Sequence, residues 1–265
     1  MSFSKMMKSE VYKNLVEKLN LCAIGAVTQL PKEMKEFKLG GTYRNGAKGA
    51  PNRSEYSENP HFYEGPGIPK LEDADRKYPN GPFKTGVKGR GQHFLEGANE
   101  CSDLYVKYKF NGKTFGCLIK RKKEKTLKYF AFPGGNKDDA DDGVGETALR
   151  EFFEEVCSNA SLENVDEICK MLSTGKIRLV KKSVMDDARI TDNSWIESNI
   201  FEIEISGEGA EKMMKRLNEL LTPCPTETLG AEIVEITPEF IKESVWGTHE
   251  LAVQEIYESD VVPSL

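Results

Sequence analysis

The 265-residue sequence lacks what membrane-spanning and nucleic-acid-binding proteins need. The apolar stretch nearest its N-terminus, residues 21–27, is seven residues long, whereas a bilayer span takes about 20. Acidic residues outnumber basic ones by 43 to 37, which gives a formal net charge of −6. This sign disfavours non-specific binding of nucleic-acid phosphates. We therefore expect neither a membrane nor a nucleic acid as partner.

Histidines and paired cysteines are scarce as well. The three histidines lie far apart and the six cysteines form no C-x-x-C pair, so the spacing of a zinc site is missing. A chain of this length does not need disulfide staples. The short apolar run follows a helix-like stretch with two glutamates, which is unlike a secretory signal. We expect reduced cysteines and a cytoplasmic location, and a mitochondrial location stays open.

The chain divides into two parts that differ in composition and residue pattern. Apolar residues recur every four positions over residues 4–20, which predicts an amphipathic helix. Residues 40–91 hold ten glycines and six prolines, too many for regular helix or sheet, but also six aromatic residues. We predict an N-terminal helix and an ordered Gly/Pro-rich extension over residues 1–94, followed by the core domain over residues 95–265.

The core domain mixes strand and helix patterns. Apolar and polar residues alternate over residues 103–110, and Asn111-Gly112 is typical of a tight hairpin turn. Further strands are predicted near 114–120, 127–132, 177–184, 195–205 and 231–236. Helices are predicted near 144–157, 162–172, 208–221 and 239–258. This mixture indicates an α+β fold built as an α/β/α sandwich.

One predicted helix carries a cluster of acids. Its apolar side chains fall in one stripe at helical spacing: Leu149, Phe152, Phe153 and Val156. Three carboxylates project from the opposite side: Glu151, Glu154 and Glu155. Magnesium and similar hard cations bind carboxylate and carbonyl oxygens, and the preceding pair Gly134-Gly135 can bring a backbone carbonyl close. The cluster therefore indicates a metal site, with a solvated acidic helix face as the alternative.

The same residues carry a resemblance to a known family. Gly135, Asp142 and the run Arg150-Glu151-Phe152-Phe153-Glu154-Glu155 resemble the Nudix box, G-x5-E-x7-R-E-U-x-E-E-x-G-U with U apolar. This sequence differs by one extra residue in the acidic loop, by Asp142 in place of Glu, and by Cys157 in place of Gly. None of these differences removes the three helix carboxylates.

Three further segments are similar to Nudix ADP-ribose pyrophosphatases of the mitochondrial type. Residues 186–195 resemble their D-D-P-R-N-T-D-N-A-W stretch, residues 85–91 their T-G-L-x-G-R-G segment, and residues 246–249 their L-Y-A-S/N-H motif. The first of these stretches also occurs in the Nudix-homology domain of the ADP-ribose-gated melastatin channel.

The resemblance implies a Nudix fold, a mixed sheet between helices, that hydrolyses ADP-ribose to AMP and ribose 5-phosphate with Mg²⁺ or Mn²⁺. It implies metal ligands at Glu151, Glu154, Glu155 and the carbonyl of Gly134. It implies that Arg150 orients the carboxylates. A carboxylate near the metal can take the proton of the attacking water, and Glu151 and Glu154 are the candidates for this general base. The resemblance also implies contacts to the substrate from Asp187, Arg189, His249 and Thr85.

Two other functions stay open at this point. One is hydrolysis of another nucleoside diphosphate derivative, and the other is a catalytically silent ADP-ribose sensor. In each case we expect a small nucleotide as the ligand and a monomeric protein.

Overall fold

The computed structural model describes residues 9–29, 93, 95, 97–121, 129–185, 190, 191, 193–245 and 247–261. By its internal contacts the chain forms two compact units. Unit 1 comprises residues 1–26, 101–181 and 199–265, and unit 2 comprises residues 27–100 and 182–198. Within the described ranges, no helix is long and apolar enough to cross a membrane.

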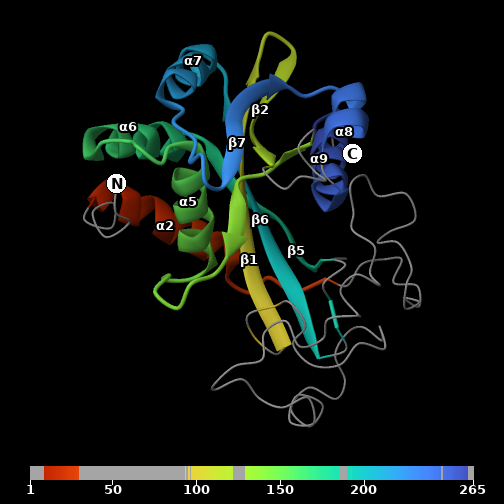
Figure 1. The fold of residues 1–265 in the computed structure, drawn as a ribbon. Coiled ribbons are helices and arrows are strands. Elements are labelled where there is room, and N and C mark those ends of the chain that lie inside the picture. The colour runs from red at the N-terminus through yellow and green to blue at the C-terminus, as the bar shows by residue number, and fades with distance from the viewer. Residues whose placement is uncertain are drawn as a thin grey trace. The chain divides into compact units, whose positions relative to one another are not determined.

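The described strands form one sheet of seven (Figure 1). They are β1 (Gly97–Phe110), β2 (Lys113–Arg121), β3 (Phe130–Ala131), β4 (Gly134–Asn136), β5 (Lys176–Val184), β6 (Ser194–Ser206) and β7 (Thr228–Glu235). The strand order is β3-β2-β1-β6-β5, with β4 paired to β1 and β7 paired to β2. The hairpin between β1 and β2 turns at Asn111 and Gly112, whose φ angles are 52° and 71°. The turn predicted from this residue pair is confirmed.

The described helices are α2 (Glu10–Ala23), α5 (Val144–Val156), α6 (Leu162–Ser173), α7 (Ala210–Leu220), α8 (Pro238–Ser244) and α9 (Gly247–Val261). The single helix predicted over residues 239–258 is wrong. Val245 takes an extended conformation with φ −94° and ψ 141°, and it forms an isolated bridge to Phe130 of β3. Pairing with the strand therefore overrides the helical pattern at this residue and separates α8 from α9.

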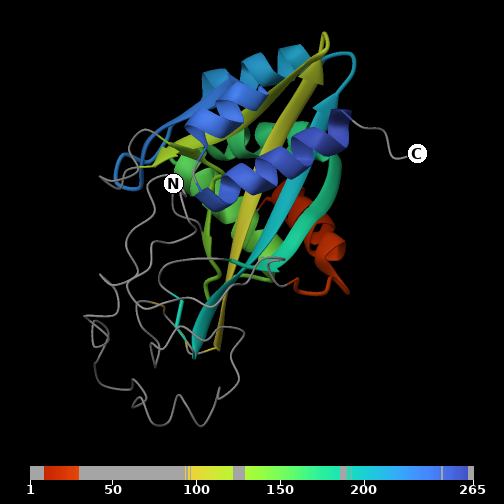
Figure 2. The same cartoon turned by 90° about the vertical axis from the view of Figure 1, so that its right-hand side faces the viewer.

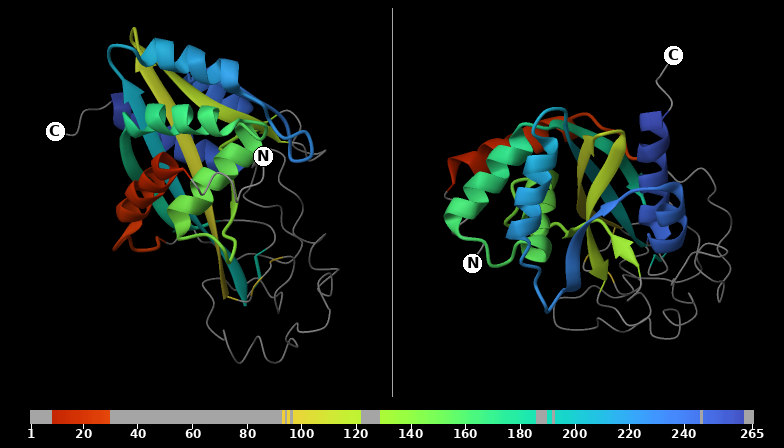
Figure 3. Two further views of the ribbon diagram at one scale, coloured as in Figure 1. Left: turned by 90° about the vertical axis from the view of Figure 1, so that its left-hand side faces the viewer. Right: turned by 90° about the horizontal axis from the view of Figure 1, so that it is seen from above.

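Two apolar clusters lie on the two faces of the sheet in unit 1. The alternation along β1 separates them, since Leu104, Val106 and Tyr108 belong to one cluster and Tyr105 to the other. The first cluster packs under α2, α5, α6 and α7, and the second under α8 and α9. Figure 2 shows α9 crossing one face of the sheet, and the right-hand view of Figure 3 shows helices on both sides of the strands. The predicted α+β class with a mixed sheet between helices is confirmed.

Helix α2 packs within unit 1. Ser9 caps its start by accepting a hydrogen bond from the Tyr12 N–H at 3.1 Å. The side chains of Leu15 and Leu19 are fully buried, and the Tyr12 ring lies 6.1 Å from the ring of Phe153 in α5. The helix predicted over residues 4–20 is thus present from Glu10 onward. The proposed boundary at residue 94 stays a prediction, because the extension before it lies almost entirely outside the described residues.

Two leucines of α2 test whether this helix is part of the folded unit. Leu19→Ala should lower the free energy of unfolding by about 3 kcal/mol, because it leaves a cavity in the core. Leu21→Ala is the matched control, since Leu21 is 58% exposed, and it should cost less than about 0.5 kcal/mol. Urea denaturation followed by circular dichroism measures both. Equal and small losses would show that α2 does not contribute to the core.

Candidate active site

Helix α5 is the element that carries the predicted acidic cluster. Its apolar stripe is in the core, with Leu149 and Phe152 fully buried. The acidic side is also largely shielded from solvent. The exposed fraction is 14% for the Glu151 side chain, 36% for the Glu154 side chain and 9% for Glu155 as a whole residue. This burial argues against a freely solvated acidic helix face.

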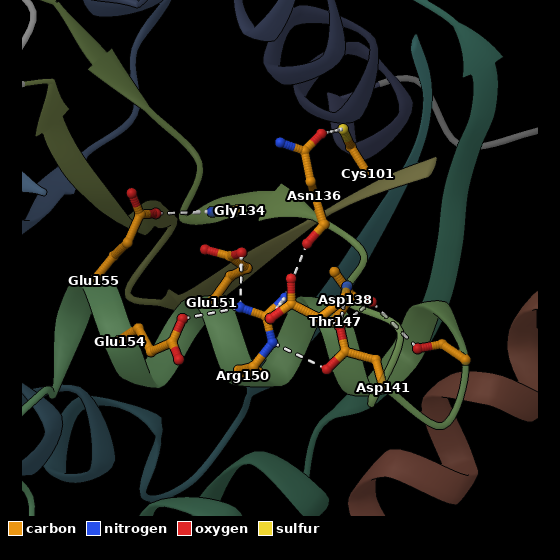
Figure 4. A network of polar contacts seen from close by, with 11 residues as sticks. Cys101, Gly134, Asn136, Asp138, Asp141, Thr147, Arg150, Glu151, Glu154 and Glu155 are labelled. Atoms are coloured by element: carbon orange, nitrogen blue, oxygen red, sulfur yellow. Dashed lines mark hydrogen bonds and ion pairs between the residues drawn. The ribbon is translucent and has the colours of Figure 1, made fainter. Parts of the chain in front are cut away.

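Arg150 stands at the centre of the acidic cluster. Its side chain is 6% exposed, and its Nε and Nη2 atoms each donate to one oxygen of Asp141 at 3.0 Å. Its Nη1 atom donates at 2.9 Å to both Glu151 Oε1 and Glu154 Oε2 (Figure 4). One guanidinium therefore holds three carboxylates, and it supplies the cation that neighbouring like charges on a helix require.

The loop before α5 fixes Arg150 from the other side. Asp141 Oδ2 also accepts hydrogen bonds at 2.9 Å from the Asp138 N–H and from Thr147 Oγ1. The carbonyl of Asn136 accepts from Arg150 Nη2 at 2.9 Å. Although burial opposes ionisation, the hydrogen bonds from Arg150 keep the pKa of Asp141 below its usual value. The acidic loop is thus folded around Arg150.

Glu155 points away from Arg150 and toward the backbone of β4. Its Oε2 accepts a hydrogen bond at 2.9 Å from the N–H of Gly134, as Figure 4 shows. A Cβ atom at Gly134 would collide with Asp103, and one at Gly135 would collide with the carboxylate of Glu151. Glycine at both positions therefore lets the strand approach the acidic helix closely. The expected role of the Gly134 carbonyl as a metal ligand stays a prediction.

Burial disfavours the charged forms of the three clustered carboxylates of α5. Burial raises the pKa of Glu151 to about 7 against the opposing effect of Arg150. Burial raises the pKa of Glu155 to about 8, which the Gly134 hydrogen bond counteracts in part. The pKa of Glu154 is raised by burial as well. The charged forms of these groups are disfavoured as they stand, and an additional cation would favour them.

Sequence reasoning missed a fourth carboxylate and a nearby cation. The negative charge of Glu227, in the turn before β7, raises the pKa of Glu151, Glu154 and Glu155. The positive charge of Arg121, at the end of β2, lowers the pKa of Glu155. Residue 121 pairs with residue 228 across β2 and β7, which puts the two strand ends together. No local pattern marks either residue, because the sheet register brings them to the site.

Of the expected substrate contacts, the structure describes His249 alone. Thr85, Asp187 and Arg189 lie outside the described residues, and their roles stay predictions. His249 is 8% exposed, and its Nδ1 accepts the N–H of Phe132 at 3.0 Å. The ring therefore carries its proton on Nε2, which lies 3.9 Å from Asp103 Oδ1. The hydrogen bond joins His249 to Phe132, which lies two residues before Gly134, the partner of Glu155.

The cluster has suitable ligand atoms for a divalent cation, but its side chains do not yet converge on one point. Its ligands are all oxygen, as Mg²⁺ and Mn²⁺ prefer, and buried carboxylates with raised pKa values favour the approach of a cation. Among the residues that the structure describes, no three acidic, histidine or cysteine side chains converge as a preformed metal centre. Arg150 holds Glu151 and Glu154, whereas Gly134 holds Glu155, so the carboxylates have to reorient to share one ion.

Replacing Arg150 tests whether it organises the cluster. Arg150→Met should lower the free energy of unfolding by about 3 to 5 kcal/mol, because it leaves the fully buried carboxylate of Asp141 without its cation. Arg216→Met is the control, since Arg216 makes a similar paired contact to Glu167 with a side chain that is 40% exposed. Its effect should be much smaller. Comparable losses in chemical denaturation would contradict the central role of Arg150.

The buried histidine predicts a pH dependence of stability. Burial, with a smaller effect from the positive charge of Arg121, lowers the pKa of His249 to about 3 from 6.5. Between these values the unfolded chain binds a proton that the folded chain excludes. Stability is therefore full above about pH 6.5 and falls as the pH drops, by about 1.4 kcal/mol per pH unit from this group. In unfolding titrations from pH 7 to 4, His249→Asn should lose this part of the slope, and an unchanged slope would contradict the assignment.

No family model matches the chain. It is 33% identical over 120 residues to a Caenorhabditis elegans protein provisionally named nudix hydrolase 6, which covers 44% of this chain and 43% of that protein. It is 28% identical over 176 residues to the mitochondrial ADP-ribose pyrophosphatase of Rattus norvegicus, which covers 56% of this chain and 49% of that protein. The chain thus matches less than half the length of these two curated relatives.

Similar solved structures include the Nudix domain of Shewanella oneidensis NrtR complexed with ADP ribose, with a TM-score of 0.43 and 12% identity over 62% of this chain and 89% of that one. Another is a Caenorhabditis elegans Ap4A hydrolase binary complex, with a TM-score of 0.40 and 12% identity over 62% of this chain and 98% of that one. The two curated sequence relatives confirm that this chain resembles the Nudix hydrolases, an ADP-ribose pyrophosphatase of the mitochondrial type among them.

Proposed function

We propose that this chain is a metal-dependent hydrolase that cleaves the pyrophosphate of ADP-ribose to AMP and ribose 5-phosphate. The observation that carries the proposal is the buried acidic face of α5, on which one guanidinium and one backbone N–H hold Glu151, Glu154 and Glu155. The name of the rat relative and the similarity of residues 186–195 to that type of pyrophosphatase support ADP-ribose as the substrate.

The residues of the site suit the splitting of a phosphoanhydride. Mg²⁺ or Mn²⁺, when bound, supplies positive charge for the phosphoryl oxygens. The oxygens of Glu151, Glu154 and Glu155 would hold the cation. Arg150 Nη1 donates to one oxygen of Glu151 and to one oxygen of Glu154, so the cation would bind through the other oxygen of each carboxylate. Either of these two glutamates is a candidate to take the proton of the attacking water.

His249 and Arg121 are two groups that could contact the substrate. The N–H at His249 Nε2 is a hydrogen-bond donor that adds no charge, whereas Arg121 adds the positive charge that a diphosphate needs beside an acidic cluster. We propose contacts to the substrate from His249, and also from Thr85, Asp187 and Arg189, on the basis of the family resemblance. We further propose a cytoplasmic monomer that acts on small nucleotides, with a mitochondrial location as the alternative.

A catalytically silent sensor of ADP-ribose is the second candidate. Silent versions of such a site are expected to lose metal-binding carboxylates, and this chain keeps three of them in one buried cluster. Their retention favours an enzyme.

The proposal predicts that the purified protein releases AMP from ADP-ribose when Mg²⁺ is added and that chelation abolishes the reaction. Replacing Glu154 and Glu155 together by Gln should reduce kcat by at least about 100-fold, because the ligands lose their charge while the side-chain shape is kept. Chromatographic detection of AMP measures the rate. Circular dichroism should show that the double variant stays folded.

Glu17→Gln is the matched control, because Glu17 is an exposed glutamate of α2. It should leave the rate unchanged. A panel of sugar nucleotides and dinucleotides, scored in the same assay, separates ADP-ribose from other nucleoside diphosphate derivatives. Binding of ADP-ribose without release of AMP, in either Mg²⁺ or Mn²⁺, would refute the enzyme and favour the sensor.

A further inference from the structure

The start of the acidic helix α5 has no cap of its own. Its N-cap residue is Gly143, with φ 89°, and a glycine has no side chain that can accept a hydrogen bond from the first turn. The first N–H groups of a helix need partners from outside the helix. Glu146, in the first turn of α5, accepts the N–H of Asp142 through its Oε2 at 2.5 Å, which ties the helix to the loop, and the amide of Gly145 needs another acceptor.

Asn20, at a distance of 125 residues in sequence, supplies that acceptor from helix α2. Its Oδ1 accepts the N–H of Gly145 at 2.7 Å, and its Nδ2 donates to the carbonyl of Asp142. One amide therefore joins the acidic loop to the first turn of α5 and acts as the cap that Gly143 cannot provide. In Figure 1, α2 lies next to α5, which agrees with their direct contacts.

The two glycines at the start of α5 leave room for this amide. A Cβ atom at Gly143 would come within 2.8 Å of Asn20 Oδ1. A Cβ atom at Gly145 would come within 2.7 Å of both the backbone nitrogen and Oδ1 of Asn20. The close approach of Asn20 of α2 therefore explains why residues 143 and 145 are both glycine.

Helix α2 is a firm support for Asn20. Leu19, the residue before it, is fully buried in the core cluster that contains α5. At its other end, the Ser9 hydroxyl donates to Asp166 of α6. The position of the Asn20 amide is therefore set by the packing of α2 against α5 and α6.

We propose that Asn20 is a positioning residue of the proposed active site, an inference that rests on the proposed function. The path runs from Asn20 to the loop at Asp142, from the adjacent Asp141 to Arg150, and from Arg150 to Glu151 and Glu154. Movement at the start of α5 changes where Arg150 holds these carboxylates. The N-terminal helix is thereby part of the catalytic unit, although it contributes no group that touches the substrate.

The test compares Asn20→Ala with Asn14→Ala in the full chain, because Asn14 is an exposed asparagine of the same helix. Asn20→Ala should lower kcat about tenfold with KM for ADP-ribose changed less than about twofold, since small displacements of catalytic groups cost rate steeply. The Mg²⁺ concentration for half-maximal rate should rise about fivefold. Asn20→Asp keeps the acceptor for Gly145 but loses the donor to the Asp142 carbonyl, so it should cap the helix without recovering the rate.

Hydrogen exchange gives a readout that does not need activity. Asn20→Ala should speed exchange of the Gly145 amide about tenfold, whereas Asn14→Ala and Asn20→Asp should leave it near the wild-type rate. If kcat and the Mg²⁺ requirement of Asn20→Ala match those of Asn14→Ala, Asn20 has only a structural role and the proposal is overturned. It is also overturned if Asn20→Asp, which lacks the donor to Asp142, hydrolyses ADP-ribose at the wild-type rate.

The proposed function can fail separately from this inference. If the wild-type chain hydrolyses no nucleoside diphosphate derivative, the enzyme assignment is wrong. Mn²⁺ binding, followed by paramagnetic broadening, and exchange at Gly145 then decide whether Asn20 positions the acidic helix. Unchanged Mn²⁺ affinity and exchange in Asn20→Ala would overturn the inference under those conditions too.

Discussion

The buried contact between Arg150 and Asp141 is the interaction on which the acidic site depends. A guanidinium with a nearly inaccessible side chain is stable in a protein interior only when carboxylates surround it, and Asp141 meets it with two hydrogen bonds of equal length. That pair brings the loop before α5 onto the helix. It also leaves one nitrogen, Nη1, directed at Glu151 and Glu154.

The acids of the site do not all share one partner. Arg150 contacts Asp141, Glu151 and Glu154, while Glu155 accepts the neutral backbone N–H of Gly134 and interacts with the positive charge of Arg121. Burial raises the pKa values of Glu151 and Glu155 in spite of these partners. A fold whose only requirement was stability gains nothing from such an arrangement. A site that receives a cation and an anionic phosphate together does, because the cation completes the charge balance.

Local periodicity was enough to predict much of the fold. The alternation after residue 103, the Asn111-Gly112 turn and the helical stripe around Leu149 depend on neighbours in sequence, and each appears in the structure. Strand β4 was not predicted, because Gly134-Gly135-Asn136 has no alternation of its own and is a strand only through its pairing with β1. The same holds for the break at Val245, which is set by a contact with β3.

The candidate site shows the same limit at the level of side chains. The helical period predicts that Glu151, Glu154 and Glu155 share one side, but it does not predict that two of them turn to Arg150 and one to Gly134. Asn20 and Glu227 reach the site from elements more than 70 residues away in sequence, so no local pattern reveals them. The fold brings these side chains to the site, and their amide and carboxylate groups then act there.

The segment from Phe132 to Gly134 connects the helices on the two faces of the sheet. The N–H of Phe132 donates to His249 of α9, and the N–H of Gly134 donates to Glu155 of α5. Between them, the carbonyl of Pro133 accepts the N–H of Leu104 in β1 at 3.0 Å, and proline has no N–H that would need a partner. Three consecutive residues are therefore fixed to α9, β1 and α5 in turn. A shift of this segment would move the hydrogen-bond partners of both His249 and Glu155. The backbone of this segment therefore couples the position of the expected substrate contact, His249, to that of the expected metal ligand, Glu155.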